Sequence, residues 1–534
     1  MRVRGRGRGD TFSAVRMRTV LPRPLWLSLL LLSCGPMGAP ASDGAGRVVT
    51  GRVTYDARHP TEQGASEQVQ VRPARWVDVA LLAGDEVLAE GQTDADGRFS
   101  IEGPVQADTV RVSARVRVRG HDVAIARDPG GESTHAMEAP IDAELALHAR
   151  DETGDAGAFH VVDTMLRGMD AVKEWTGRPL PPVFAYWVRG GTREWSFYRG
   201  ERPTGSGRYA LELLGGEPGQ ASTTDTDEHD EAIILHELGH FVMDRLTSDS
   251  SVGGMHPRGA RIDPGLAWEE GRASWFALAV LGAPFYRDTI GVQPWGRTRV
   301  DEDLEAGEDP VVGYASETTV TMVLWDLIDR GEVDRDADGI ALEPGAVLEA
   351  MVTHAAEPGS FASLPSFLRH LVDRGRVDEA ALTAMLGRTS VPTDDLLVAA
   401  DALPWPVDVA IGGSRSGKID GLTQPAPSGG PNLPITGFDA NHTYRVRVTE
   451  PGMLVARLRI VGTGRAGEGT DHTDLDLELR DLRADLVADS RTHEPLETVA
   501  HFVEPGWYIV KVRDGGQGNR ADYTLEIDQE TLAD

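Results

Sequence analysis

Hydrophobic and polar residues alternate with two different periods along the chain. Between residues 48 and 118, and again between 443 and 527, apolar and polar positions alternate one by one in short runs separated by turns. This period of two is typical of strands with one buried face. Between residues 159 and 388 the apolar positions mostly recur every three or four residues, the period of amphipathic helices. The pattern predicts a multidomain protein in which an α+β domain lies between two antiparallel β-sandwiches.

The domain boundaries are placed where the pattern changes. A chain of 534 residues is long enough for several domains of about 100–200 residues each. We predict a signal peptide at 1–33, a linker at 34–46, a β-sandwich at 47–150, an α+β domain at 151–403 and a second β-sandwich at 404–534. The first sandwich is expected to act as a spacer or docking module rather than to carry chemistry.

Arginines and a short apolar run mark the N-terminal segment. The run Leu25–Ser33 is too short to span a bilayer and is typical of a signal peptide. It ends in Leu-Leu-Ser-Cys, which resembles a bacterial lipobox and implies a lipid anchor on Cys34; cleavage near Gly38 is the alternative. Cys34 is the only cysteine, so the chain forms no internal disulfide. Because Gly35 replaces the Asp of an inner-membrane retention signal, we expect an outer-membrane lipoprotein of the cell envelope, or an extracellular protein.

Acidic residues outnumber basic ones. The chain has 84 Asp and Glu against 53 Lys and Arg, a formal net charge of -31. This balance disfavours nucleic acid as a partner and suits a soluble, outward-facing protein. Contact with a membrane is expected only through the lipid anchor.

The central domain contains a His-Glu-x-x-His sequence within the apolar run Ile233–Val242. On a helix, His236 and His240 lie one turn apart and point the same way, so both imidazoles can reach one metal ion. Glu237 then lies beside the metal, where it can act on a bound water. The alternative is a chance match on an ordinary core helix.

A catalytic zinc ion usually has three protein ligands and one open position for water, so a third ligand is needed besides the two histidines. The metzincin continuation requires Gly and His three and six places after the second histidine, and this chain has Met243 and Leu246 there, which excludes that class. A second helix is predicted over 266–282, and it begins with two adjacent acids, Glu269 and Glu270. Either acid is a candidate ligand. The alternative is that neither binds a metal and both simply place negative charge near a helix N-terminus, where it is favourable.

The string Glu-Gly-Arg-Ala-Ser-Trp-Phe-Ala that starts at Glu270, thirty residues past His240, resembles the third-ligand helix of gluzincin peptidases. The resemblance covers the two helices and extends over about 150–400. It implies a zincin-like fold in which Glu270 is the third zinc ligand, with Glu269 as the alternative. The loop between the helices is longer than the compact gluzincin spacing.

With such ligands the expected reaction is zinc-dependent hydrolysis of peptide bonds, in which Glu237 takes a proton from water and delivers it to the leaving amine. Two candidates for stabilising the oxyanion are His256, in a Gly-rich loop, and Tyr314; the alternative for each is an ordinary surface residue. Asp244 and Ser274, each one turn after a ligand, are candidates to hold the ligands in place, or else helix-surface residues.

Segments around the two helices carry further expectations. The strand at 208–214 precedes the His-Glu-x-x-His helix and is expected to be an edge strand that binds extended peptide. The acids of 223–231 are expected to cap that helix, with His229 in solvent. The sequence Asp334–Gly339 begins like a calcium-binding EF-hand loop, but its twelfth position is Gly345, so a solvated acidic turn is favoured over a Ca²⁺ site.

Both flanking sandwiches resemble known modules. Val-x-Gly-x-Val followed by Thr-Asp-Ala-Asp-Gly-Arg-Phe at 93–99 resembles the carboxypeptidase-regulatory-like, transthyretin-like domain. Strings at 474–479, 504–512 and 519–525 resemble the bacterial pre-peptidase C-terminal domain, which accompanies secreted proteases and can bind Ca²⁺.

Two functions are weighed. The first is an active zinc metallopeptidase acting on protein or peptide substrates. The alternative is a non-catalytic surface adhesin or binding protein built on a peptidase-like fold. The retained Glu237 favours the peptidase, because a decayed enzyme has no chemical need for a base between two ligand histidines.

Overall fold

The computed structural model describes most of the chain from residue 46 to residue 530. Gaps fall at 143–144, 192–194, 201, 218–223, 249–250, 252, 255, 307–308, 310, 336–338, 389–394, 399–402, 422–435, 463–473 and 516–518. The predicted signal peptide and Cys34 lie outside the described residues. Within the described residues, no helix combines the length and apolar character needed to cross a membrane.

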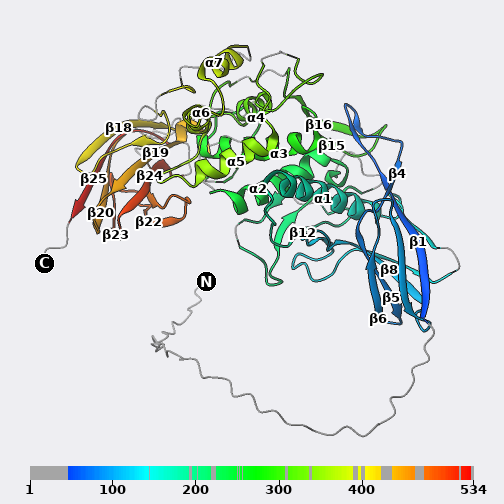
Figure 1. Ribbon diagram of the computed structural model, residues 1–534. Coiled ribbons are helices and arrows are strands. Elements are labelled where there is room, and N and C mark those ends of the chain that lie inside the picture. Colours follow the sequence, from blue (N-terminus) through cyan, green and yellow to red (C-terminus); the bar gives the residue numbers. More distant parts are fainter. Residues whose placement is uncertain are drawn as a thin grey trace, which may run out of the picture. The chain divides into compact units, whose positions relative to one another are not determined.

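The N-terminal strands, blue in Figure 1, form two sheets around one core. The first sheet has β1 at its centre and consists of β1 (Gly46–Ala57), β4 (Gln70–Pro73), β7 (Arg98–Pro104) and β11 (Leu145–Ala149). The second begins with β5 (Val77–Ala83), β6 (Glu86–Gln92), β8 (Thr109–Val116), β9 (Val123–Ala126) and β10 (Ala136–Pro140). The expected alternation is present: along β8 every second residue is buried.

The second sheet does not end with the predicted sandwich. β9 pairs in parallel with β12 (Val183–Tyr186), and β12 pairs in parallel with β14 (Tyr209–Glu212). β1 and β11 are also parallel. The prediction of a purely antiparallel N-terminal sandwich is therefore wrong. All four residues of β9 are buried, as in a strand covered on both faces, which alternation cannot reveal. The predicted boundary at 150 cuts across this sheet and stays a prediction.

Helices cover the continuation of this sheet. The long helix α1 (Ala156–Thr176) contacts β1, β8 and β9, and it packs against α2 (Glu231–Leu246). Further along come α3 (Pro264–Leu281), the hairpin of β15 (Phe285–Ile290) and β16 (Arg297–Asp303), and α4 (Glu317–Asp326). The central region ends with α5 (Pro344–Ala355), α6 (Leu364–Asp373) and α7 (Glu379–Arg388). The helices predicted at 233–242 and 266–282 are thus present, and α1 and α4 lie within the stretch 159–388 where the helical period was found.

The strand expected to bind substrate is not an edge strand. β14 pairs with β12 on one side and with β13 (Phe197–Tyr198) on the other, through Leu211 and Glu212. The chain between β13 and β14 folds back on itself, so β13 occupies the free side of β14. The edge-strand prediction for 208–214 is therefore wrong.

The C-terminal residues form a β-sandwich of two sheets around a second core, yellow through orange to red in Figure 1. One sheet has the order β17 (Val407–Asp408), β19 (Asn441–Val448), β24 (Gly506–Asp514), β21 (Leu475–Arg480) and β22 (Leu486–Ser490). The other has the order β18 (Gly413–Asp420), β25 (Arg520–Glu530), β20 (Gly452–Gly462) and β23 (Leu496–Val503). Except for the short β17–β19 pair, every pairing described in the two sheets is antiparallel, as predicted.

Candidate metal centre

The helix α2 brings the His-Glu-x-x-His sequence into the core. Its apolar residues Ile234, Leu238 and Phe241 are fully buried, which fixes the rotation of the helix. Gly239 lies against α3: a Cβ there would be 3.0 Å from the backbone oxygen of Ala273 and 3.1 Å from its Cα. The absence of a side chain at Gly239 therefore lets α2 and α3 approach closely.

The start of α3 is defined by capping. The Asp263 carboxylate accepts hydrogen bonds from the backbone N–H groups of Gly265 and Leu266, at 2.9 and 3.3 Å, and Pro264 occupies the first turn. Further along, a Cβ on Gly271 would lie 2.4 Å from Val320 of α4. The three helices α2, α3 and α4 thus meet around the residues that follow.

Three side chains from α2 and α3 converge on one point. The Nε2 atoms of His236 and His240 are 3.1 Å apart. Oε2 of Glu270 lies 3.3 Å from Nε2 of His236 and 3.1 Å from Nε2 of His240. The two imidazole rings are nearly perpendicular, with centroids 4.7 Å apart. The structure therefore brings together the three residues named as zinc ligands from the sequence.

This triangle fits a zinc ion. Tetrahedral zinc with bonds of about 2.0–2.1 Å separates neighbouring ligand atoms by about 3.3 Å. Oε2 of Glu270 is buried and makes no hydrogen bond of acceptable geometry with the residues that the structure describes, as expected for an atom whose partner is a metal. A donor set of two imidazoles and one carboxylate also suits zinc.

The adjacent acid, Glu269, points elsewhere. Its carboxylate pairs with the buried guanidinium of Arg272, one turn along α3, which also donates to the hydroxyl of Thr247 at 2.7 Å. Of the two acids that the sequence left open, Glu270 is the one that lies with the histidines.

Two further residues connect the ligands to α4. Nδ1 of His236 is 3.0 Å from the hydroxyl of Ser274, and that hydroxyl donates to Oε1 of Glu317 at 3.2 Å. On the other side, Nδ1 of His256 is 3.2 Å from Oε2 of Glu317, while its Nε2 is 3.5 Å from Oε2 of Glu270. Ser274 thus contacts a ligand as predicted, and Glu317 is a shared partner that sequence reasoning missed.

Burial and charge act against each other at the centre. Burial lowers the pKa of His240, but the negative field of Glu270 outweighs it and raises the pKa to about 10. The same opposition raises the pKa of His256 to about 9. For Glu317, burial raises the pKa, but Arg258 and His256 outweigh it and lower the pKa to about 2. The buried carboxylates of Glu270 and Glu317 thus create a strong preference for positive charge.

Tyr286 and Arg258 complete the surroundings. The edge of the Tyr286 ring faces His236, with centroids 6.0 Å apart, and the Arg258 guanidinium lies 4.3 Å above the same ring. Burial, and to a lesser degree the charges of Glu317 and Glu237, raise the pKa of Tyr286 well above its usual value. Glu237 itself is buried. Nothing local in the sequence marks Tyr286, because β15 reaches the site through tertiary packing.

Three predicted placements differ from the structure. Tyr314 packs against Phe438, with ring centroids 6.0 Å apart and nearly perpendicular rings, and none of the contacts described for it involves His236 or His240. Asp244 accepts a hydrogen bond from the hydroxyl of Tyr198 at 2.5 Å, so it does not hold His240. His229, expected in solvent, is buried, and burial lowers its pKa to about 3.

The EF-hand-like segment lies partly outside the described residues, because 336–338 are among the gaps. Its first residue, Asp334, offers a carboxylate oxygen within 4.8 Å of those of Glu305 and Asp329. The solvated acidic turn favoured from the sequence therefore stays a prediction, and the Ca²⁺ site stays its alternative.

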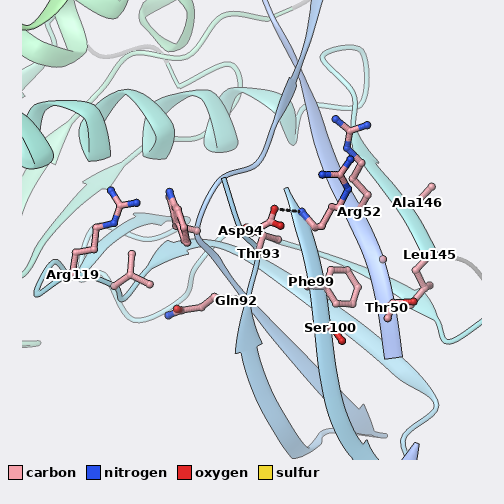
Figure 2. A pocket seen from close by; sticks show the side chains of 14 residues that line it. Thr50, Arg52, Gln92, Thr93, Asp94, Phe99, Ser100, Arg119, Leu145 and Ala146 are labelled. Atoms are coloured by element: carbon pink, nitrogen blue, oxygen red, sulfur yellow. Dashed lines mark hydrogen bonds between the residues drawn. The ribbon is translucent and has the colours of Figure 1, made fainter. Parts of the chain in front are cut away.

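A pocket of about 940 Å³ lies on the N-terminal sheets (Figure 2). It is lined by segments of β1, β7 and β11 and by Trp76, whose ring is covered by the Arg119 guanidinium at 4.5 Å. None of its lining residues belongs to the histidine cluster.

Comparison with known families gives one match. Residues 202–357 match the family described as mycolysin C-terminal domain. These 156 positions (357 − 202 + 1) are less than a third of the 534 residues, and they include α2, α3 and α4. Over this range the chain is peptidase-related. No curated protein matches the chain.

Solved structures are only distantly similar. The pre-peptidase C-terminal domain of collagenase from Bacillus anthracis is 12% identical, with 23% of this chain and 93% of that chain covered and a TM-score of 0.17. PliG, a periplasmic inhibitor of g-type lysozyme from Aeromonas hydrophila, is 10% identical, with coverages of 23% and 96% and a TM-score of 0.15. At these TM-scores the likenesses do not bear on the fold or the function.

Proposed function

We propose that this protein is a zinc-dependent peptidase of the gluzincin type that hydrolyses peptide bonds outside the cytoplasm. The observation that carries the proposal is the convergence of His236, His240 and Glu270 at mutual distances of 3.1–3.3 Å. The peptidase-related match over 202–357 supports the same class of reaction.

The two histidines and Glu270 would hold the zinc ion. When bound, zinc supplies a Lewis acid that activates water and polarises the scissile carbonyl. For His236 to bind through Nε2, its Nδ1 must carry the proton and donate it to the Ser274 hydroxyl, 3.0 Å away. The hydroxyl in turn donates to Glu317, so the hydrogen-bond chain has one consistent direction.

Glu237 acts as the general base. It follows His236 directly on α2 and is buried, so its carboxylate is shielded from bulk water. It takes a proton from the attacking water and passes it to the nitrogen of the leaving amine.

His256 is proposed to stabilise the oxyanion. Glu317 is 3.2 Å from its Nδ1, and its Nε2 lies 3.5 Å from the ligand carboxylate of Glu270, so the imidazole is held at the metal centre where a charged donor could act on an oxyanion. Tyr286, which borders His236 and Glu237, takes the place that sequence analysis gave to Tyr314.

The location is proposed from the N-terminal segment. The signal peptide and the lipid on Cys34 would anchor the enzyme in the cell envelope, with protein or peptide substrates reaching it from outside.

The test is zinc content, by mass spectrometry, together with casein or peptide hydrolysis. Wild type is compared with Glu237→Gln and Glu270→Ala, and Glu174→Gln on the exposed side of α1 is the matched control. We expect one zinc per chain in wild type, Glu237→Gln and the control. We expect zinc loss mainly in Glu270→Ala, and loss of hydrolysis by at least about 10²-fold in both site variants.

Other outcomes have defined meanings. Zinc retained in Glu270→Ala keeps the peptidase but moves the third ligand to Glu269 or His256. A protein that folds without zinc and hydrolyses nothing removes the proposal and leaves the surface binding protein as the alternative. The pocket lined by Trp76 would then be the first place to look for a ligand.

A further inference from the structure

Four aspartates gather where the start of α2 meets β15. Asp225, Asp227 and Asp230 come from the segment that leads into α2, and Asp288 comes from β15. One carboxylate oxygen of each lies within 4.8 Å of those of the other three. Among the contacts of the described residues, none joins these four to the zinc ligands, so this is a separate place in the fold.

The four carboxylates are largely removed from solvent. Asp230 is 0% exposed, Asp227 is 3% exposed and Asp288 is 9% exposed. The nearby cation is Arg299, whose guanidinium is 3.3 Å from Asp225 and 3.9 Å from Asp288. Arg258 and Arg297 also exert positive charge on Asp288, but among the described residues only Arg299 forms ion pairs with the cluster. Four acids against one paired arginine leave negative charge that is costly to bury without a further cation.

Hydrogen bonds satisfy only part of the cluster. The hydroxyl of Ser196 donates to Asp227, and the N–H and hydroxyl of Thr289 donate to Asp230 at 2.7 and 2.8 Å. Oδ1 of Asp288, however, is buried and has no hydrogen-bond partner among the described residues. A fixed oxygen of this kind inside a carboxylate cluster is expected when its partner is an ion.

The hydrogen bonds of Asp230 also indicate that the cluster does more than cap the helix α2. It is the N-cap residue of α2, yet its side chain caps no N–H of that helix. Both of its oxygens are used toward β15 instead. Asp230 is thus the N-cap residue and Glu231 lies in the first turn, as expected, but the expectation that the Asp230 side chain caps the helix is wrong.

We propose that Asp225, Asp227, Asp230 and Asp288 bind a divalent cation of the calcium type. Carboxylate oxygens without imidazole or thiolate are the donors that hard cations prefer, and Ca²⁺ completes its six to eight ligands with water or carbonyl oxygens. The all-oxygen donor set separates this site from the imidazole-containing zinc centre. The inference does not depend on the peptidase function.

A cation bound at this site would fix the strand β15 relative to the helix α2, which carries His236 and His240. On β15, Tyr286 and Asp288 are two residues apart and both buried, so they face the same side about 6–7 Å apart. Asp288 would reach the cation while Tyr286 borders His236. The ion thus ties the start of α2 to the strand that lines the zinc centre.

The first experiment uses the purified full-length protein, stripped with a chelator, and measures thermal unfolding with added CaCl₂, MgCl₂ or ZnCl₂. We expect 1 mM CaCl₂ to raise the Tm of wild type by at least about 3 °C. Asp288→Asn should lose this rise, while Asp85→Asn, in an exposed turn, should keep it. Without Ca²⁺, the Tm of Asp288→Asn should equal or exceed the Tm of wild type, because the substitution removes one of the negative charges that repel one another. A purely structural aspartate would not give this crossover.

Two controls distinguish other sites. Asp334→Asn and Glu270→Ala should keep the response to CaCl₂. If Ca²⁺ has no effect on wild type, or if Asp288→Asn responds as wild type does, the proposal is overturned. Loss of the response in Asp334→Asn with its retention in Asp288→Asn would place the ion at Glu305, Asp329 and Asp334 instead.

Terbium luminescence offers a check that needs no aspartate variant. Trp195 lies next to the cluster: its ring is 5.1 Å from the Arg299 guanidinium, which pairs with Asp225. Excitation of tryptophan should sensitise bound Tb³⁺, and CaCl₂ should abolish the signal. Trp195→Phe should reduce the signal at least about two-fold; an unchanged signal in that variant contradicts the assignment.

Discussion

Glu317 is the residue on which the two sides of the proposed zinc centre depend. Its carboxylate accepts from Ser274, is 3.2 Å from Nδ1 of His256, and is 3.6 Å from the guanidinium of Arg258. It therefore orients a ligand histidine through one oxygen and the proposed oxyanion stabiliser through the other. Such partners commonly determine metal affinity without touching the metal.

Replacement of Glu317 by Gln should weaken zinc binding by about 10–100-fold. The amide keeps the size of the side chain, but it can no longer accept from all three partners or neutralise Arg258. Competition with a chromophoric chelator measures the affinity, and circular dichroism checks the fold. The role given to Glu317 is contradicted if zinc affinity stays within two-fold of wild type.

His354, on α5, is a buried histidine outside the centre. It lies edge-on against Phe367, and burial lowers its pKa to about 4, aided by His370. The charged groups that face it are His370, Glu357 and Arg272. The unfolded chain, with a histidine pKa near 6.5, binds a proton that the folded protein excludes. Stability is therefore lost as pH falls from about 6.5 to about 4, by about 3 kcal/mol in total.

The variant His354→Leu should flatten this part of the pH profile. Urea unfolding at pH 7, 5.5 and 4.5 gives the slope, and His493→Gln, on an exposed residue, should leave the slope unchanged. His370 keeps a smaller contribution, because burial lowers its pKa too. An equal slope in wild type and His354→Leu would show that other groups cause the acid sensitivity.

At the scale of elements, the approach of α2 to α3 decides whether the ligands meet. Gly239 allows this approach, since a Cβ would lie 3.0 Å from the backbone oxygen of Ala273. Alanine gains about 1 kcal/mol of helix propensity over glycine, but here the obstacle is backbone that cannot move aside without shifting α3. Strain from such overpacking costs about 1–3 kcal/mol and exceeds the gain.

Gly239→Ala should therefore destabilise the protein by about 1–2 kcal/mol and weaken zinc binding, because His240 and Glu270 move apart. Gly387, near the end of α7, is a matched control, since a Cβ added there would meet no atom within 4 Å. Gly387→Ala should be neutral or stabilising by up to about 1 kcal/mol. Chemical denaturation measures both; equal effects in the two variants would refute the importance of the contact.

At the scale of the whole molecule, the C-terminal sandwich is joined to the helix that carries Glu270. Lys511 of β24 pairs with Asp263 at 2.9 Å, and both side chains are almost completely buried. Asp263 is also the cap of α3. Beside this pair, the backbone N–H of Asp263 donates to the carbonyl of Thr436 at 2.8 Å. The sandwich thus takes part in defining where α3 begins.

Lys511→Met should cost about 3–5 kcal/mol, because Asp263 is left as a buried, uncompensated charge. Lys418→Met, on an exposed position of β18, should change stability by less than about 0.5 kcal/mol. Adding Asp263→Asn to Lys511→Met should recover part of the loss, as measured by a double-mutant cycle. A Lys511→Met variant as stable as the control would show that the sandwich is not coupled to α3.

The elements themselves were largely predictable. The helical period and the spacing of His236 and His240 are local features, and they indicated α2 and α3. The alternation in the C-terminal strands predicted those strands equally well, because one face of each strand is buried in a sandwich. The strand β9 was harder to predict, since a strand that is buried on both faces shows no alternation of apolar and polar residues.

What the sequence by itself determined is the set of chemical groups and their local periodicity. It could not choose between Glu269 and Glu270, because adjacent helical residues differ by about 100° in direction and only packing against α2 sets the rotation. Nor could it bring Tyr286, Glu317 and Asp288 to their places, since their partners lie far from them along the chain. Tertiary structure decided these contacts, because burial of the apolar faces of α2, α3 and α4 fixes which polar groups are left facing one another.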